Sequence, residues 1–177
     1  TTQGAPNAVP AAAATPIPTP TPVGAAVETQ PLTPVPEVQE SGTAIYQPVR
    51  ASFITCEHGV MFWLEDSNQV FVLVNGDSTA EGTFSLYQNT WREGMPETDS
   101  TLQAPEGLVQ PDRMFGQAWR TYPGVKDNLG WGTAAAQNFT ALVVRDQGNI
   151  TVSAPDNRVY TLDAGGTWAA VDYYEQP

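Results

Sequence analysis

The residues best suited to covalent chemistry stand together in Cys56-Glu57-His58. Alternate residues of a strand point to one face, so Cys56 and His58 could form a thiol–imidazole pair. No third group is placed to orient the imidazole, and the chain has no Gly-x-Ser-x-Gly turn. We therefore interpret the triplet as the end of a strand and Cys56 as a small buried apolar residue, and we predict no catalytic residue.

Carboxylates are the second candidates, since a pair of them at the right separation hydrolyses glycosides. Six lie in or near expected turns: Glu57, Glu65, Asp66, Glu93, Glu97 and Asp99. Turn acids are usually solvated. One Cys and one His exclude a four-ligand zinc site within one chain, and the loop 77–81 lacks the ligand spacing of a calcium loop. We expect no metal and no cofactor.

Tryptophan side chains stack on sugar rings and anchor protein interfaces. Trp63, Trp119 and Trp168 are expected to fill a core. Trp91 and Trp131 lie beside loop residues, so we expect them to be exposed and to bind carbohydrate or a partner. Two asparagines, Asn138 and Asn149, fit the N-glycosylation pattern.

The charge balance limits the partners. Nineteen acids against seven bases give a net charge of −12, which argues against a nucleic-acid partner because phosphate contacts need clustered Lys and Arg. No stretch approaches the roughly 18 apolar residues that a membrane span needs, so we expect no membrane insertion. The sequence begins at Thr1, as it would after removal of a signal segment. We expect an extracellular or cell-surface protein.

Residues 1–45 differ in kind from the rest. They hold nine prolines and no aromatic residue, Lys or Arg, which predicts an extended polyproline II arm that could reach roughly 140 Å. Pro next to Thr is typical of O-glycosylated stalks, and the candidate sites are Thr15, Thr19 and Thr21. Isolated apolar side chains could dock the arm on a neighbouring chain: Val9, Ile17, Val23, Val27, Leu32, Val35 and Val38.

Residues 46–177 have the pattern of a β-rich globular domain. Apolar runs at 60–64 and 70–74 flank turn formers and predict a hairpin, followed by a strand at 83–87. Gly and Pro make 92–111 a long loop. A helix should begin at Pro111 and end near Arg120, and a short helical turn at 124–129 should stop at Gly130.

The last third repeats the first. A shift of 89 positions aligns five identical residues within twenty-one, and they fall on expected turn and core positions: Gly59 with Gly148, Asn68 with Asn157, Val70 with Val159, Leu73 with Leu162, and Gly76 with Gly165. We predict a mainly β fold of antiparallel sheets. Two repeated three-stranded units, 53–91 and 142–175, should flank the helical segment 111–130.

Motifs within residues 53–165 resemble the LGFP repeats of bacterial cell-surface proteins. They are a short helix with Trp119, then Leu129-Gly130-Trp131, then a Gly-led hairpin at 148–162, although Trp131 and Gly132 stand where LGFP repeats have Phe and Pro. The segments 57–63 and 110–113 also look like motifs of unnamed bacterial extracellular β-rich domains. The resemblance implies a surface role, with cell-wall attachment as the associated activity.

These features predict a non-enzymatic structural or adhesive subunit outside the cell. Its arm, residues 1–45, would dock on another copy or on a filament, as in a pilus-like assembly. The alternative is a carbohydrate or cell-wall binding module on a stalk, with surface glycans as partners. A glycoside hydrolase is the third possibility.

Overall fold

A computed structural model describes residues 45–173 of the chain. The apolar positions and threonines singled out in the arm therefore lie outside the described residues. Within residues 45–173, neither helix is long and apolar enough to cross a membrane.

The body consists of two four-stranded halves separated by two helices. The first half comprises β1 (Gln47–Cys56), β2 (Gly59–Leu64), β3 (Gln69–Asn75) and β4 (Glu81–Gln88). The helices are α1 (Arg113–Thr121) and α2 (Val125–Leu129). The second half comprises β5 (Gln137–Asp146), β6 (Asn149–Ser153), β7 (Arg158–Leu162) and β8 (Thr167–Asp172).

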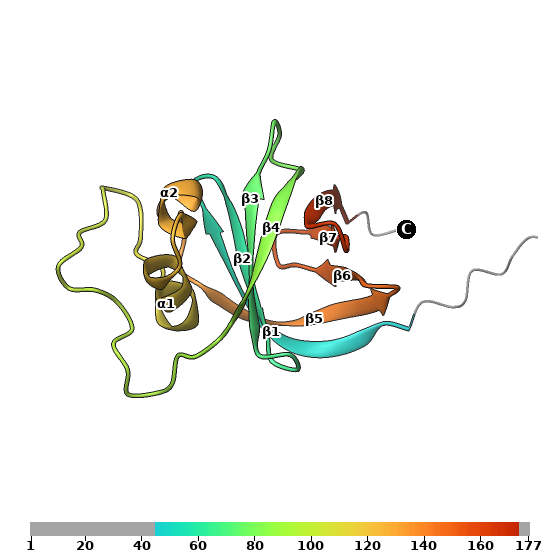
Figure 1. Cartoon of the computed structure of the whole chain (residues 1–177), viewed down its shortest axis with the longest axis horizontal. Coiled ribbons are helices and arrows are strands. Elements are labelled where there is room, and N and C mark those ends of the chain that lie inside the picture. Colours follow the sequence, from blue (N-terminus) through green and yellow to red (C-terminus); the bar gives the residue numbers. More distant parts are fainter. Residues whose placement is uncertain (1–44, 174–177) are drawn as a thin grey trace, which may run out of the picture. The chain divides into compact units, whose positions relative to one another are not determined.

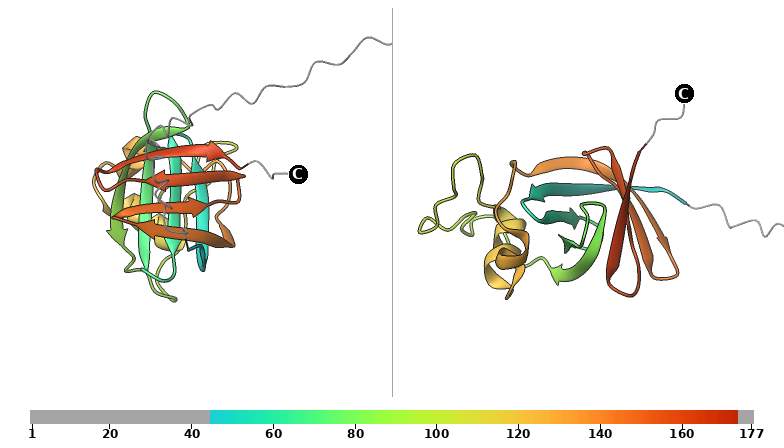
Figure 2. Two further views of the ribbon diagram at one scale, coloured as in Figure 1. Left: turned by 90° about the vertical axis from the view of Figure 1, so that its right-hand side faces the viewer. Right: turned by 90° about the horizontal axis from the view of Figure 1, so that it is seen from above.

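All eight strands join in one antiparallel closed barrel with the order β1-β2-β3-β4-β8-β7-β6-β5. The halves meet along two seams. β1 pairs with β5 from Gln47↔Val143 to Phe53↔Gln137, whereas β4 pairs with β8 only from Glu81↔Ala169 to Thr83↔Thr167. Figure 2 shows the strands of the second half running across those of the first.

The expected mainly β, antiparallel fold is confirmed. The three-stranded units are not, because each half contributes four strands. The first unit was predicted from residue 53 and the second from residue 142, but β1 begins at Gln47 and β5 at Gln137. In the omitted segments, 47–52 and 137–141, exposed residues interrupt the buried ones, so these segments lack the apolar runs that marked the other strands.

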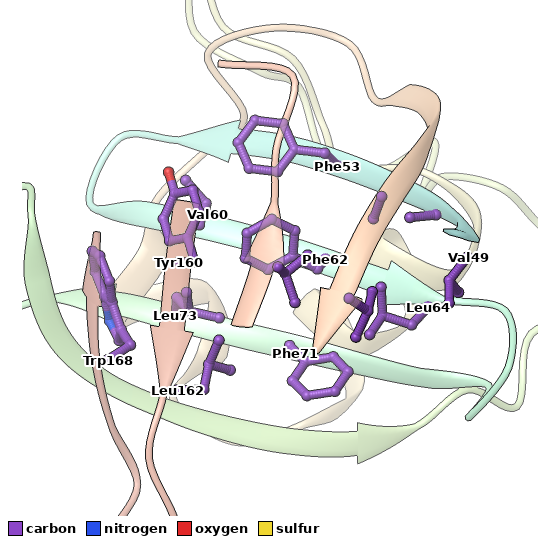
Figure 3. Close-up of a cluster of buried hydrophobic side chains, with 14 residues drawn as sticks. Val49, Phe53, Val60, Phe62, Leu64, Phe71, Leu73, Tyr160, Leu162 and Trp168 are labelled. Carbon is purple, nitrogen blue, oxygen red and sulfur yellow. The ribbon is translucent and has the colours of Figure 1, made fainter. Parts of the chain in front are cut away.

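The barrel interior is filled by alternate side chains from both halves (Figure 3). Phe62 of β2 meets Tyr160 of β7 edge to face, with ring centroids 4.9 Å apart. Trp168 of β8 crosses the narrow seam, where its indole N–H donates to the Val74 carbonyl at 3.0 Å. Gly82 makes room for it, since a Cβ there would lie 2.9 Å from the indole nitrogen.

A second core lies on the outer face of β1–β3, under the two helices (Figure 1). Its helical members include Phe115, Trp119 and Leu129, all with no exposed surface. β2 is therefore covered on both sides, which explains the unbroken apolar run at 60–64. The predicted helix is confirmed as Arg113–Thr121, and the second ends at Leu129 before Gly130, whose φ is 70°.

Candidate functional site

The Cys56–Glu57–His58 triplet forms the turn between β1 and β2. The Cys56 side chain is buried in the core beneath the helices, whereas His58 is exposed. Burial, and secondarily the charge of Glu57, raises the pKa of the Cys56 thiol to about 12. The thiol therefore stays protonated at neutral pH, and the two side chains do not form a nucleophile–base pair.

Five of the six carboxylates considered for hydrolysis have structural partners. Glu57 accepts the backbone N–H of Trp131 at 2.8 Å. Three others form ion pairs with arginines: Arg50–Glu65 at 2.6 Å, Arg145–Asp66 at 2.8 Å and Arg113–Glu97 at 3.0 Å. Asp99 accepts the hydroxyl and N–H of Thr101, and these hydrogen bonds hold its pKa below the usual value. Most of the six candidate carboxylates are therefore engaged by neighbouring groups of the fold.

The long loop after β4 starts from a hydrogen-bonded asparagine pair. Asn89 donates its amide N–H to the Asn68 side-chain oxygen at 3.0 Å, and Trp63 donates its indole N–H to the same oxygen at 3.2 Å. The Asn89 side-chain oxygen accepts the backbone N–H of Trp91 at 3.0 Å. Because Asn89 is buried and its amide is bonded on both sides, this pair fixes the position of Trp91.

Further along, the loop is held against α1. Arg113 at the start of the helix donates its backbone N–H to the Glu97 carbonyl at 3.0 Å and forms an ion pair with the Glu97 carboxylate. Gly116 permits this approach, since a Cβ there would lie 2.8 Å from the Glu97 carbonyl oxygen. Loop and helix thereby form two walls with a space between them.

That space is a hollow of about 520 Å³ beside Trp91. Its loop wall includes Met95, Thr98 and Asp99, and its helix wall is formed by Gln117 and Arg120. Trp91 is half-buried, and its buried indole N–H has no acceptor among the described residues. One aromatic ring among planar amide, carboxylate and guanidinium groups is a lining suited to a polar ring such as a sugar.

Trp131, the other tryptophan expected to be exposed, is half-buried and lies in a different cluster. Its ring contacts Trp119 with centroids 5.1 Å apart, and the Lys126 ammonium nitrogen lies 5.0 Å from the Trp119 centroid and 5.4 Å from that of Trp131. These cation–π contacts occupy the ring surface that a ligand would need. The structure thus separates Trp91 and Trp131 into two sites, and the hollow described above adjoins Trp91.

The two N-glycosylation candidates are exposed residues of β5 and β6. The side-chain oxygen of Asn138 accepts the Ser52 hydroxyl at 2.5 Å, and that of Asn149 accepts the Ala164 N–H at 3.3 Å. Each amide nitrogen, to which a sugar would attach, is left without a hydrogen bond within residues 45–173. Both asparagines therefore remain candidates for modification.

The polar wall of the hollow was not predicted from the sequence. Gln117 and Arg120 are three residues apart on a predicted helix, so they share a face, and that spacing was the available signal. The loop residues that line the hollow could not be placed beside the helix from the sequence, because a long loop has no periodic pattern. A scan of family models and searches among curated proteins and solved structures found no match to this chain.

Proposed function

We propose that this chain is a non-enzymatic extracellular subunit of a surface assembly, in which residues 1–45 attach the barrel to neighbouring subunits or to a filament. The observation that carries the proposal is the change in composition at residue 45. No aromatic residue, Lys or Arg precedes Tyr46, and β1 begins at Gln47. A segment so poor in apolar area cannot offset its own ordering entropy, so a binding partner would have to order it.

The chemistry of the body also supports a non-enzymatic role. The only thiol is buried and protonated at neutral pH, and most of the candidate carboxylates are engaged in turns or ion pairs. The resemblance to bacterial surface repeats supports an extracellular location.

Removing residues 1–40 tests the role of the arm. We expect the full chain to form larger species in sedimentation velocity, and the truncated chain to remain a folded monomer with an unchanged melting temperature. Equal assembly by both chains would contradict the proposal. A fall in melting temperature on truncation would mean that the arm serves its own barrel instead.

A second candidate function is carbohydrate binding, and the hollow beside Trp91 favours it. The hollow combines one aromatic ring with several hydrogen-bonding groups and has room for a short saccharide. A saccharide hydroxyl could also supply the acceptor that the buried indole N–H of Trp91 lacks, if the loop adjusts on binding. In this case the arm would act as the stalk.

Intrinsic tryptophan fluorescence with cello-, xylo-, malto- and chito-oligosaccharides tests this second function. We expect one of these sugars to quench the emission, and the Trp91→Ala variant to weaken binding about tenfold or more, because stacking and hydrogen bonds are lost together. Arg120→Ala should weaken binding as well. The control is Arg145→Ala, which removes an arginine of β5 that does not line the hollow. Unaltered binding by Trp91→Ala would exclude this site.

A further inference from the structure

The seam between β4 and β8 leaves part of the β4 edge uncovered. The pairing of β4 with β8 ends at Thr83↔Thr167, although β4 continues to Gln88. Beyond this seam the Phe84 N–H donates to the Gly166 carbonyl at 2.9 Å, which is the last backbone contact of β4 on that side. Within residues 45–173, no strand pairs with this side of β4 from Ser85 to Gln88.

Backbone groups of this edge are free to bind another strand. Because successive residues of a strand direct their N–H and C=O groups to opposite sides, Leu86 and Gln88 face the same side as Phe84. The Gln88 carbonyl has a long contact, 3.5 Å, from the Tyr122 hydroxyl. Both groups of Leu86 have no partner in the described part of the chain. Such an edge accepts an added extended strand.

A hollow of about 440 Å³, lined by apolar side chains and by Asp163, lies beside the edge. Phe84 and Leu86 of β4 line one side, and Ile150 and Leu162 of the second half line the other. Leu86 lies opposite Phe71, a residue of the barrel interior, so its side chain points to the same interior face. It is nevertheless 44% exposed. The interior is therefore not fully closed at this point.

We infer that this edge and hollow are the receptor for residues 15–22 of a second copy, Thr-Pro-Ile-Pro-Thr-Pro-Thr-Pro, which would add to β4 as an extra strand. The inference rests on the proposed assembly function and names the docking surface for the arm. Main-chain hydrogen bonds would give affinity, and one apolar side chain would give the register.

The alternation of proline in this segment suits a strand that pairs on one side only. Ile17, Thr19 and Thr21 would direct their backbone N–H and C=O groups toward β4. The backbone nitrogens that face away from β4 would then be those of the prolines at 16, 18, 20 and 22, which carry no N–H. The outer edge of the added strand would then lack donors and could not recruit a further chain.

The same alternation selects the side chain that enters the hollow. Residues directly opposite each other in an antiparallel pair place their side chains on the same face of the sheet. Opposite Leu86, Ile17 would therefore point into the hollow, and the prolines would lie on the other face. Ile17 is the only large apolar residue of the segment.

Charge and length permit docking between copies. Residues 1–27 carry no charged side chain, so the segment approaches an acidic protein without repulsion. Residues 23–44 separate it from its own barrel and span about 70 Å when extended, enough to reach a neighbouring molecule.

Matched surface substitutions in the full chain test the receptor. Leu86→Asp places a charge in the hollow, and Leu142→Asp is the control because Leu142 of β5 is equally exposed, at 45%. We expect Leu86→Asp to weaken assembly tenfold or more in sedimentation velocity and Leu142→Asp to leave it unchanged. Leu86→Pro removes the outward N–H donor together with the leucyl side chain that lines the hollow, and it should weaken assembly too.

Variants of the arm test its register. Ile17→Asp and Ile17→Pro should each reduce assembly, whereas Pro18→Ala should not, since residue 18 would face away from β4. If removal of residues 1–40 abolishes assembly but the Leu86 and Ile17 variants assemble normally, the arm docks elsewhere: this inference fails and the proposed function stands. If the truncated chain assembles normally, both fail.

Cross-linking distinguishes a second copy from the chain's own arm. Full chains carrying Cys56→Ser with Ile17→Cys are mixed with chains carrying Cys56→Ser with Leu86→Cys and oxidised. We expect a disulfide between residues 17 and 86 in a species of twice the chain mass, identified by peptide mass spectrometry. A chain carrying both new cysteines that closes only a disulfide within itself, and stays monomeric, would overturn docking between copies.

Discussion

At the residue scale, the chemistry of Cys56 follows from its position under the helices. Its pKa of about 12 leaves roughly one molecule in 10,000 as thiolate at pH 8, against about one in ten for a thiol with the ordinary pKa of 9.0. We expect the native thiol to react with a maleimide about 1000-fold more slowly than the unfolded chain at pH 8. Labelling in rising urea should follow the unfolding curve, and rapid labelling without urea would contradict the burial.

The same residue makes stability depend on pH on the alkaline side. The folded pKa lies above the unfolded one, so the contribution of the neutral thiol is complete below pH 9 and is lost as pH rises from 9 toward 12. Cys56→Ala removes the titrating group. The unfolding free energy of this variant should fall less steeply above pH 9 than that of the parent chain, whereas equal slopes would exclude a role for Cys56.

At the element scale, the Leu129-Gly130-Trp131 motif joins α2 to the β1–β2 turn. The His58 N–H donates to the Leu129 carbonyl and the Glu57 N–H to the Trp131 carbonyl, both at 3.0 Å. Gly130 has φ 70°, and a Cβ there would lie 2.5 Å from the Glu57 carboxylate oxygen. The motif therefore has a packing role in this chain.

This contact predicts the effect of Gly130→Ala. We expect a loss of about 2–3 kcal/mol in unfolding free energy, from the backbone strain of a positive φ and from displacement of Glu57. Gly107→Ala is the control: its φ is 80°, but an added Cβ would meet nothing within 4 Å. It should cost only the strain, about 1 kcal/mol. Equal losses of unfolding free energy for the two variants in urea denaturation would show that displacement of Glu57 contributes nothing.

Local signals were sufficient for most elements. Apolar runs marked β2 and β3, and Pro111 and Gly130 marked the limits of the helical segment. β1 and β5 were cut short because Pro48, Arg50 and Thr140 break the apolar pattern on a solvent-facing side. The hollow beside Trp91 was not predicted, since it depends on hydrogen bonds of Asn89 and Glu97 between segments that the sequence places far apart.

At the scale of the whole molecule, closure of the barrel was beyond local reasoning. The pairing of β1 with β5 and of β4 with β8 joins residues about 90 apart in sequence, and periodicity carries no information on such partners. Shared turn and core residues at 59–76 and 148–165 indicated related halves. They could not show that the halves close on each other around one interior.

That common interior predicts a single unfolding transition. Phe62 of the first half is 1% exposed and packs against Tyr160 of the second, so neither half keeps the barrel interior buried when the other unfolds. Phe62→Ala should lower the unfolding free energy by about 3–5 kcal/mol. Amide exchange should quicken by similar factors in β3 and in β7, because both strands lose the same global stability. Leu142→Ala replaces an exposed side chain and should change the unfolding free energy and the exchange rates little. Faster exchange confined to β3 would show instead that the second half holds its fold alone.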